Sequence, residues 1–140
     1  DYAIVDSCGN ITNTIEKGKP FTVRMKVQMH APIEYPIFAL SIKDPKGTEI
    51  TGTNTMFEKT DFEVGPIMEI SFEQDMNLQG GEYLLSLGCT GYNGTDFTVY
   101  HRLYDVCNIT VVSDKNTVGY YDMNSKITVQ TYEGTNICRK

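Results

Sequence analysis

The sequence is poor in residues and patterns that several protein classes need. Among its 140 residues there is no Trp, and there are only two His and four Cys. No apolar run approaches the roughly 20 residues of a membrane-spanning helix, and no basic-then-apolar signal segment begins the chain. The absence of Trp also removes the antibody signature, in which a buried Trp packs against a disulfide between the sheets. Because the chain begins at Asp1 rather than Met, we expect a fragment or a processed product.

Positive charge is scarce as well. The 12 Lys and Arg residues face 18 Asp and Glu residues, which gives a formal net charge of −6. The only tight basic groupings are Lys17 with Lys19 and Arg139 with Lys140. Nucleic-acid binders generally carry a basic patch that neutralises phosphates, and an acidic domain is repelled by anionic lipid. We therefore expect neither a nucleic acid nor a membrane surface as a direct partner.

The cysteines do not form a metal-binding or redox pattern. Cys8, Cys89, Cys107 and Cys138 contain no C-x-x-C spacing, so a zinc knuckle is not supported. A chain of this length buries enough apolar surface to fold without a disulfide framework. We expect free, buried thiols that pack as small hydrophobic side chains.

Patterns for catalysis and for cofactors are missing too. His30 and His101 have no nucleophile at a recognisable spacing, and neither common phosphate-binding glycine motif occurs. The Asp-rich stretches 93–96 and 122–124 lack the calcium-loop pattern and are typical of turns. The sequence predicts no enzyme, no metal and no cofactor. A glycan-acting enzyme stays open as an alternative, because a carboxylate pair is defined only in three dimensions.

What the sequence does contain is a strict alternation of apolar and polar residues. In Phe21–Met29, five apolar side chains alternate with four polar ones, which is typical of a half-buried strand. The same period predicts further strands near Tyr2–Cys8, Phe38–Ile42, Glu49–Thr53, Met68–Phe72, Tyr83–Cys89, Cys107–Val111 and Ile127–Val129. No helical stripe competes with it. Seven to nine short strands predict an all-β, antiparallel β-sandwich, with residues 1–140 as a single domain.

Two connections refine this architecture. Asp44-Pro45-Lys46-Gly47 carries the residues that tight turns favour. Leu78-Gln79-Gly80-Gly81-Glu82-Tyr83 resembles a tyrosine corner, in which a Tyr hydroxyl bonds to the backbone a few residues upstream. The corner favours an immunoglobulin-like topology for the sandwich.

Aromatic side chains that the alternation does not bury are candidates for binding. We expect Gly91–Asp105 to form a loop between two late strands, and Tyr120, Tyr121 and Asp122 to form a second aromatic group. A sugar ring can stack on an aromatic side chain, while planar polar groups fix its hydroxyls. The candidate carbohydrate-binding residues are Tyr92, Asn93, Tyr100, His101, Arg102, Tyr104 and Asp105. Alternatively, these tyrosines cap the core with their hydroxyls in water.

Several ordered motifs resemble one family. Pro36–Thr55 ends in Gly52, Thr53, Asn54 and Thr55, a family motif, and the stretches Lys17–Pro20, Leu78–Tyr83 and Tyr104–Val111 follow the family pattern in order. Over about residues 4–113 the chain resembles the C-terminal carbohydrate-binding domain of the ATP-binding subunit of O-antigen and teichoic-acid-type polysaccharide ABC exporters, the Wzt C-terminal family. It departs at Ala39, where the family often has Gly.

The resemblance implies an immunoglobulin-like module that recognises a lipid-linked cell-surface polysaccharide before export. It implies a cytoplasmic location at the inner face of the cell membrane, a parent ATP-binding domain, a transmembrane exporter subunit and a homodimer. Residues 114–140 would then be an added strand or a dimer-contacting segment. The alternative is a secreted or cell-surface adhesion domain, which the four cysteines and the glycosylation sequons at Asn10, Asn93 and Asn108 would suit.

Overall fold

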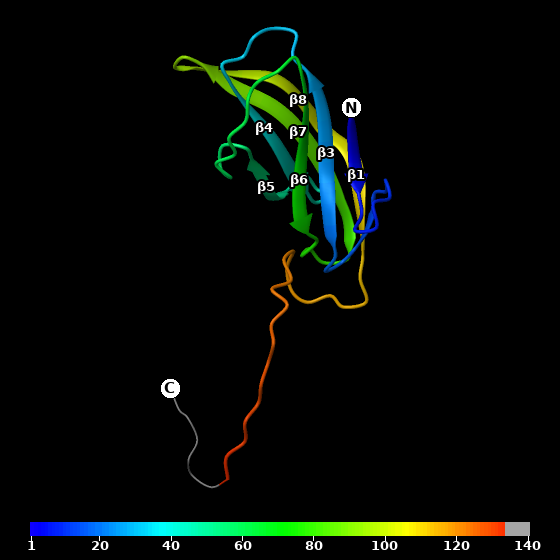
Figure 1. Ribbon diagram of the computed structural model, residues 1–140. Helices are drawn as coiled ribbons and strands as arrows, with labels where there is room; N and C mark the ends of the chain where they lie inside the picture. The colour runs from blue at the N-terminus through cyan, green and yellow to red at the C-terminus, as the bar shows by residue number, and fades with distance from the viewer. Residues whose placement is uncertain (134–140) are drawn as a thin grey trace.

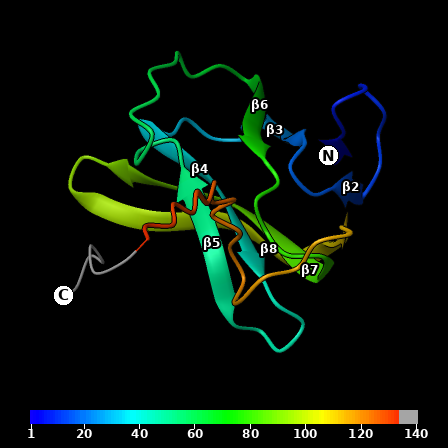
Figure 2. The same cartoon turned by 90° about the horizontal axis from the view of Figure 1, so that it is seen from below.

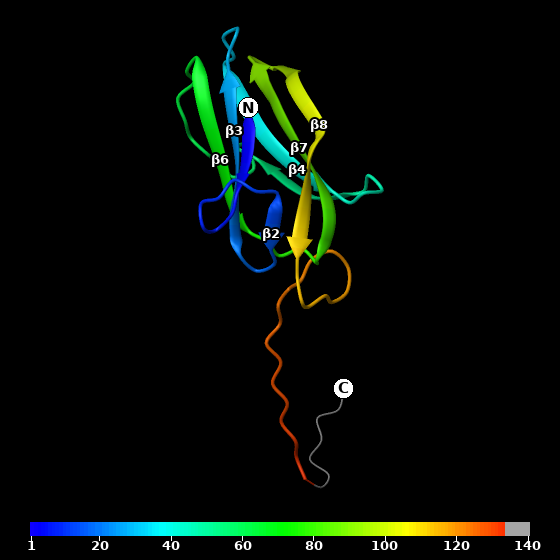
Figure 3. The same cartoon turned by 90° about the vertical axis from the view of Figure 1, so that its right-hand side faces the viewer.

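The computed structural model describes residues 1–133 and shows two β-sheets packed face to face (Figure 1). The three-stranded sheet has the order β1-β3-β6, and the five-stranded sheet has the order β2-β8-β7-β4-β5. Viewed from the side, β3 and β6 lie in one layer while β7 and β8 lie in the other (Figure 3). The strands are β1 (Tyr2–Val5), β2 (Thr14–Glu16), β3 (Pro20–Gln28), β4 (Tyr35–Lys43), β5 (Glu49–Asn54), β6 (Ile67–Asp75), β7 (Gly81–Asn93) and β8 (Asp96–Val112).

The predicted alternation produces the core between the sheets. On β7 the side chains of Tyr83, Leu85, Leu87 and Cys89 are all buried, as expected for the inward face. The other sheet contributes its own inward-facing side chains, of which Val23 on β3 is fully buried. The β-sandwich and its single core are therefore confirmed over the described residues.

The predicted turn at residues 44–47 and the predicted tyrosine corner at residues 78–83 are also confirmed. The Asp44 carboxylate accepts hydrogen bonds from the backbone N–H groups of Lys46, at 3.0 Å, and Thr48, at 2.8 Å. Gly47 closes this turn with φ of 91°, a left-handed conformation that favours glycine. In the tyrosine corner, the Tyr83 hydroxyl donates to the carbonyl oxygen of Gln79 at 2.5 Å.

The expected loop at 91–105 is wrong. Strand β7 continues to Asn93 and β8 begins at Asp96, so this stretch is the far end of a long hairpin. Only Gly94 and Thr95 connect the strands, with Gly94 at φ of 65°. Glycine, Asn and Asp in this stretch suggested a loop, although two-residue hairpin turns use the same residues.

Three further expectations need correction. The N-terminal strand ends at Val5 rather than Cys8, and Ile127 and Val129 lie in no strand, with exposed fractions of 81% and 85%. The sandwich is also not wholly antiparallel, because β2 pairs in parallel with β8. Beyond the sandwich, the chain leaves the base and extends away from both sheets to residue 133 (Figure 1). Among residues 1–133 no helix has the length and apolar character needed to cross a membrane.

The core assignment is tested by Val23→Asp. Val23 is fully buried on β3, so this variant would place an unpaired carboxylate between the sheets and should lower the free energy of unfolding by about 3–5 kcal/mol. Gln28→Asp, at an exposed position of the same strand, serves as the matched control. Thermal denaturation followed by circular dichroism measures both. Equal melting temperatures for the two variants would show that β3 presents the opposite face to the core.

Candidate functional site

The hairpin of β7 and β8 carries all seven candidate binding residues from the sequence. The two strands pair from Gly81↔Val111 to Asn93↔Asp96, with register irregularities between Leu85 and Leu87 and between Cys89 and Thr90. An extra residue in one strand shifts the alternation of side chains to the other face. The bulges therefore decide which candidates share a face.

The candidates fall into two groups on opposite faces of the five-stranded sheet. Tyr92 and Arg102 lie on its outer face, because Tyr92 and Gly88, the partner of Arg102, alternate along β7 with the inward-facing Leu87 and Cys89. Tyr104 and Asp105 share this face through their contacts with Lys43. Tyr92 shares that face with Phe97, and their ring centroids are 5.2 Å apart in an edge-on arrangement. The other group consists of Asn93, Tyr100 and His101, on the side that faces the three-stranded sheet. The sequence did not separate the groups, because bulges leave no clear signal in it.

The outer-face group is tied together around Tyr104. Its ring is 64% exposed, the Lys43 ammonium lies 5.4 Å from the ring centroid, and Arg102 Nη1 donates to its hydroxyl at 3.4 Å. Asp105 adopts a left-handed backbone conformation with φ of 49°, and its N–H donates to Ser86 Oγ at 2.9 Å. Lys43 Nζ also lies 3.8 Å from the Asp105 carboxylate. One aromatic face, two cations and one carboxylate are thus presented side by side.

Small side chains form the floor beside this cluster. Strand register aligns Arg102 with Gly88, Gly88 with Ala39, and Ala39 with Asn54, in one row across four strands. A second row aligns Ser86 with Ser41 and Ser41 with Gly52. A row of four strands spans about 14 Å. The family motif and the outer-face cluster thus lie at opposite ends of one low, polar surface.

Within the family motif, each residue has a structural role. A Cβ on Gly52 would lie 2.7 Å from the carbonyl oxygen of Leu40, so only glycine fits this close approach of β5 to β4. Asn54 Oδ1 accepts from the N–H of Phe57 at 2.7 Å. Thr55 is buried, and its hydroxyl oxygen accepts from the N–H of Phe38 at 3.2 Å. Thr53 pairs with Leu40 in the same ladder.

The second group lies beside a cavity of about 430 Å³ between the sheets. Apolar side chains from both sheets contribute to its wall, including Val27 and Leu103, and Cys89 lies at it as well. Asn93 Nδ2 donates to the Tyr100 hydroxyl at 3.0 Å, while Asn93 Oδ1 accepts from the N–H of Glu34 at 3.1 Å. This group therefore joins the hairpin tip to the loop before β4.

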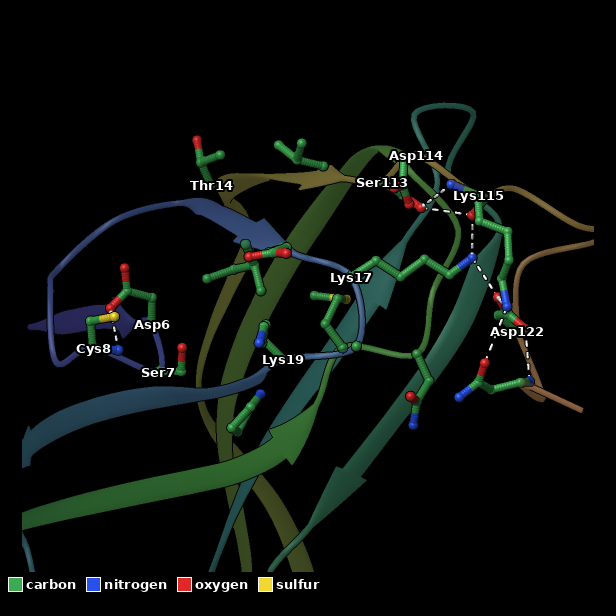
Figure 4. A pocket seen from close by; sticks show the side chains of 18 residues that line it. Asp6, Ser7, Cys8, Thr14, Lys17, Lys19, Ser113, Asp114, Lys115 and Asp122 are labelled. Carbon is green, nitrogen blue, oxygen red and sulfur yellow. Dashed lines mark hydrogen bonds and ion pairs between the residues drawn. The ribbon is translucent and has the colours of Figure 1, made fainter. Parts of the chain in front are cut away.

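A larger cavity, of about 740 Å³, opens at the base of the sandwich (Figure 4). At its edge Lys17 Nζ lies 2.5 Å from Asp122 Oδ2, and Lys115 Nζ lies 3.2 Å from the same oxygen. Lys17 also donates to Gln79 Oε1 and to the carbonyl oxygen of Lys115. The Lys17 ammonium directs all three of its hydrogens to groups of the same chain, so this side chain has a structural role.

The second aromatic group from the sequence belongs to this structural region. Tyr120 donates its hydroxyl to Asp44 Oδ2 at 2.5 Å, and Tyr121 forms an isolated bridge with Leu78. Asp122 is buried, with its N–H donating to the carbonyl oxygen of Asn77 at 2.7 Å. These residues fasten the segment after β8 to the base of the sandwich.

The described cysteines differ in burial. Cys89 is buried, Cys107 is half-buried and Cys8 is exposed, and all three carry free thiols. Burial raises the pKa of the Cys89 and Cys107 thiols, which disfavours their thiolate forms. The expectation of burial is thus wrong for Cys8, and Cys138 lies outside the described residues. Within residues 1–133 no three His, Cys, Asp or Glu side chains gather to hold a metal ion.

The ion pair at the base predicts a dependence of stability on pH. A hydrogen bond from Lys17 and another from the backbone N–H of Asn124 lower the pKa of Asp122 from 3.8 to about 2. A lowered carboxyl pKa stabilises the fold above pH 3.8, and this contribution is lost as the pH falls through about 2.

The melting temperature should therefore drop over that interval, and the drop should be smaller in Asp122→Asn. Asp114→Asn, at an exposed position of the same segment, should behave like the unaltered protein. Differential scanning calorimetry at several pH values measures this difference. Parallel curves for the protein and Asp122→Asn would exclude the ion pair as the cause.

Comparison with known proteins identifies the family. Curated protein sequences yielded no match. A solved structure, described as the crystal structure of the C-terminal domain of Wzt, superimposes with a TM-score of 0.84 at 24% sequence identity. The alignment covers 93% of this chain and 81% of that chain. The family model described as the Wzt C-terminal domain matches residues 1–123. The chain belongs to the Wzt C-terminal domain family.

Proposed function

We propose that this chain is a non-catalytic carbohydrate-binding module of a polysaccharide ABC exporter, and that glycan lies on the outer face of its five-stranded sheet. Membership of the Wzt C-terminal domain family supports the role in an exporter. The proposed position of the glycan rests on the exposed ring of Tyr104. This ring contacts Arg102 and Lys43 and lies at the edge of a floor of small residues.

The outer face has the chemistry that sugars require. The apolar side of a pyranose can stack on the Tyr104 ring, and Arg102 and Asp105 offer planar donors and acceptors for ring hydroxyls. Gly88, Ser86 and Ala39 expose little side chain beside them, so a chain of sugars can approach the sheet closely. Polar residues along a surface, rather than a closed pocket, suit an extended polymer.

The ligand class follows from the family role. We propose a lipid-linked cell-surface polysaccharide of the O-antigen or teichoic-acid type, recognised in the cytoplasm at the inner face of the cell membrane. The partners would be the parent ATP-binding domain and the transmembrane exporter subunit. Because the chain has a net charge of −6, a glycan that carries few negative charges is favoured, so of these two types the O-antigen type fits better than the polyanionic teichoic-acid type.

We propose further that residues 1–140 act as one domain whose C-terminal segment contacts a second copy. Residues 126–130 alternate between polar and apolar side chains, and Ile127 and Val129 are almost fully exposed. An extended segment with this alternation that packs on no sheet of its own chain can pair with the open sheet edge of another protomer. This would make the homodimer depend on the segment after Asp122.

The glycan site is tested by Tyr104→Ala. Removing the exposed ring should weaken polysaccharide binding by about 1–2 kcal/mol, because its stacking contact is lost. Tyr121→Ala, at an exposed tyrosine of the base, should leave the affinity unchanged. Isothermal titration calorimetry with the polysaccharide from the same source measures both. Weakening by Tyr100→Ala in place of Tyr104→Ala would move the glycan to the cavity between the sheets.

The dimer is tested by replacing both Ile127 and Val129 with Asp. Charges on the apolar side of the segment should abolish pairing with a second copy and yield a monomer. Sedimentation velocity at several concentrations measures the association state, and Thr128→Asp on the alternate side is the control. A double variant that sediments like the unaltered protein would place any dimer contact elsewhere.

A further inference from the structure

We propose that residues 56–67, which follow β5 and end at the first residue of β6, form a docking surface for a protein partner whose contacting face is apolar and rimmed by basic residues. The segment exposes five large apolar side chains within twelve residues. Their exposed fractions are 50% for Met56, 68% for Phe57, 39% for Phe62, 42% for Val64 and 60% for Ile67. Concentrated exposure of this kind marks interaction sites, whereas single exposed apolar residues are ordinary.

The segment is held in place rather than left loose. Asn54 Oδ1 receives the N–H of Phe57, and the N–H of Thr60 donates to the carbonyl oxygen of Thr55 at 2.9 Å. Lys59 closes this turn in the left-handed region with φ of 52°. The last two residues of the family motif thus order a turn that directs Met56 and Phe57 outward. A preorganised surface loses little conformational entropy on binding.

One aromatic side chain fastens the segment to the core. The Phe62 ring packs on the fully buried Phe38, with centroids 5.8 Å apart. At the far end, the Pro66 carbonyl oxygen accepts from the N–H of Met29 at 2.8 Å. Phe57 has no such partner and is the most exposed aromatic residue of the segment. We therefore expect Phe57 to insert into a recess on the partner protein.

Charge decides which class of partner fits. Glu58, Asp61 and Glu63 flank the apolar residues, while Lys59 is the only cation in the segment. Three negative charges against one positive charge leave a net charge of −2 on a chain that is itself at −6. At this surface the same acidic segment of a second copy, or an anionic lipid surface, would be repelled. Lys or Arg residues around an apolar recess would complement it.

The position of the segment leaves the proposed glycan face open. Strand β5 belongs to the five-stranded sheet and β6 to the three-stranded sheet, so the connection passes along the edge of the sandwich (Figure 2). Partner and glycan can bind together. The identity of the partner rests on the proposed function. If the chain belongs to an exporter, the basic surface is expected on one of the other exporter polypeptides.

Photocrosslinking tests the docking surface in the full-length exporter subunit, assembled with its transmembrane partner. A benzophenone amino acid at Phe57 should crosslink to an exporter polypeptide, and the same probe at Val118, an exposed position of the base, should not. Combining the probe with Glu58→Lys and Glu63→Lys should lower the yield by about tenfold, because the charge attraction is reversed.

The outcomes separate this proposal from the glycan-binding role. Equal yields at positions 57 and 118, or a crosslink from position 57 to glycan or to a second copy of this domain, would overturn the docking surface. Polysaccharide binding by the isolated domain, measured in parallel with Phe57→Ser, should be unchanged. Crosslinking without any glycan binding would instead count against the proposed function alone.

Discussion

Burial of one face of β7 against the three-stranded sheet is the interaction on which the rest of the structure depends. Tyr83, Leu85, Leu87 and Cys89 point inward, and this orientation fixes the opposite face for Ser86 and Gly88. Because β4 and β8 pair with β7 on either side, the same choice sets the outward positions of Ala39, Ser41 and Arg102. A slip of one residue would exchange the core with the candidate binding surface. Fold and site are therefore specified by one constraint.

Strand prediction worked wherever a core covers one face. The inward-facing positions of β3, β4 and the lower part of β7 are apolar, because the facing sheet excludes polar side chains there. It failed toward the hairpin tip, where Phe97 and Val99 are exposed on paired strands. In that part, hydrogen bonds between the strands maintain the hairpin. Because neither face is buried there, no selection for apolar side chains at alternate positions remains. The opposite error occurred at Ile127 and Val129, where alternation is present without any strand.

The candidate site was predicted in part. Residue chemistry correctly drew attention to the aromatic and polar positions between 92 and 105, but spacing could not assign them to faces. That assignment depends on two bulges, at Tyr100 and around Asp105, which alter the alternation along β8. Neither Tyr nor Asp is a residue type that predicts a bulge from sequence. Lys43 was not predicted as a member of the site, because its contact with Tyr104 joins strands 61 positions apart in sequence.

The family motif shows how one short sequence can serve several needs. Gly52 permits the close approach of β5 to β4, and Thr55 satisfies a buried backbone group of Phe38. Asn54 ends one row of the outer face and orders the turn at Phe57. The motif therefore connects the sheet that we propose for glycan with the edge that we propose for a protein partner.

The proposal that glycan lies on the outer face of the five-stranded sheet can be tested on the isolated domain. Titration of the isotope-labelled domain with the polysaccharide from its own source, observed through backbone amide NMR shifts, tests it most directly. We expect saturable shifts at Arg102, Tyr104 and Asp105 and along the neighbouring row through Gly88 and Ala39. Shifts confined to the cavity around Tyr100 and His101, or no shifts at all, would contradict it.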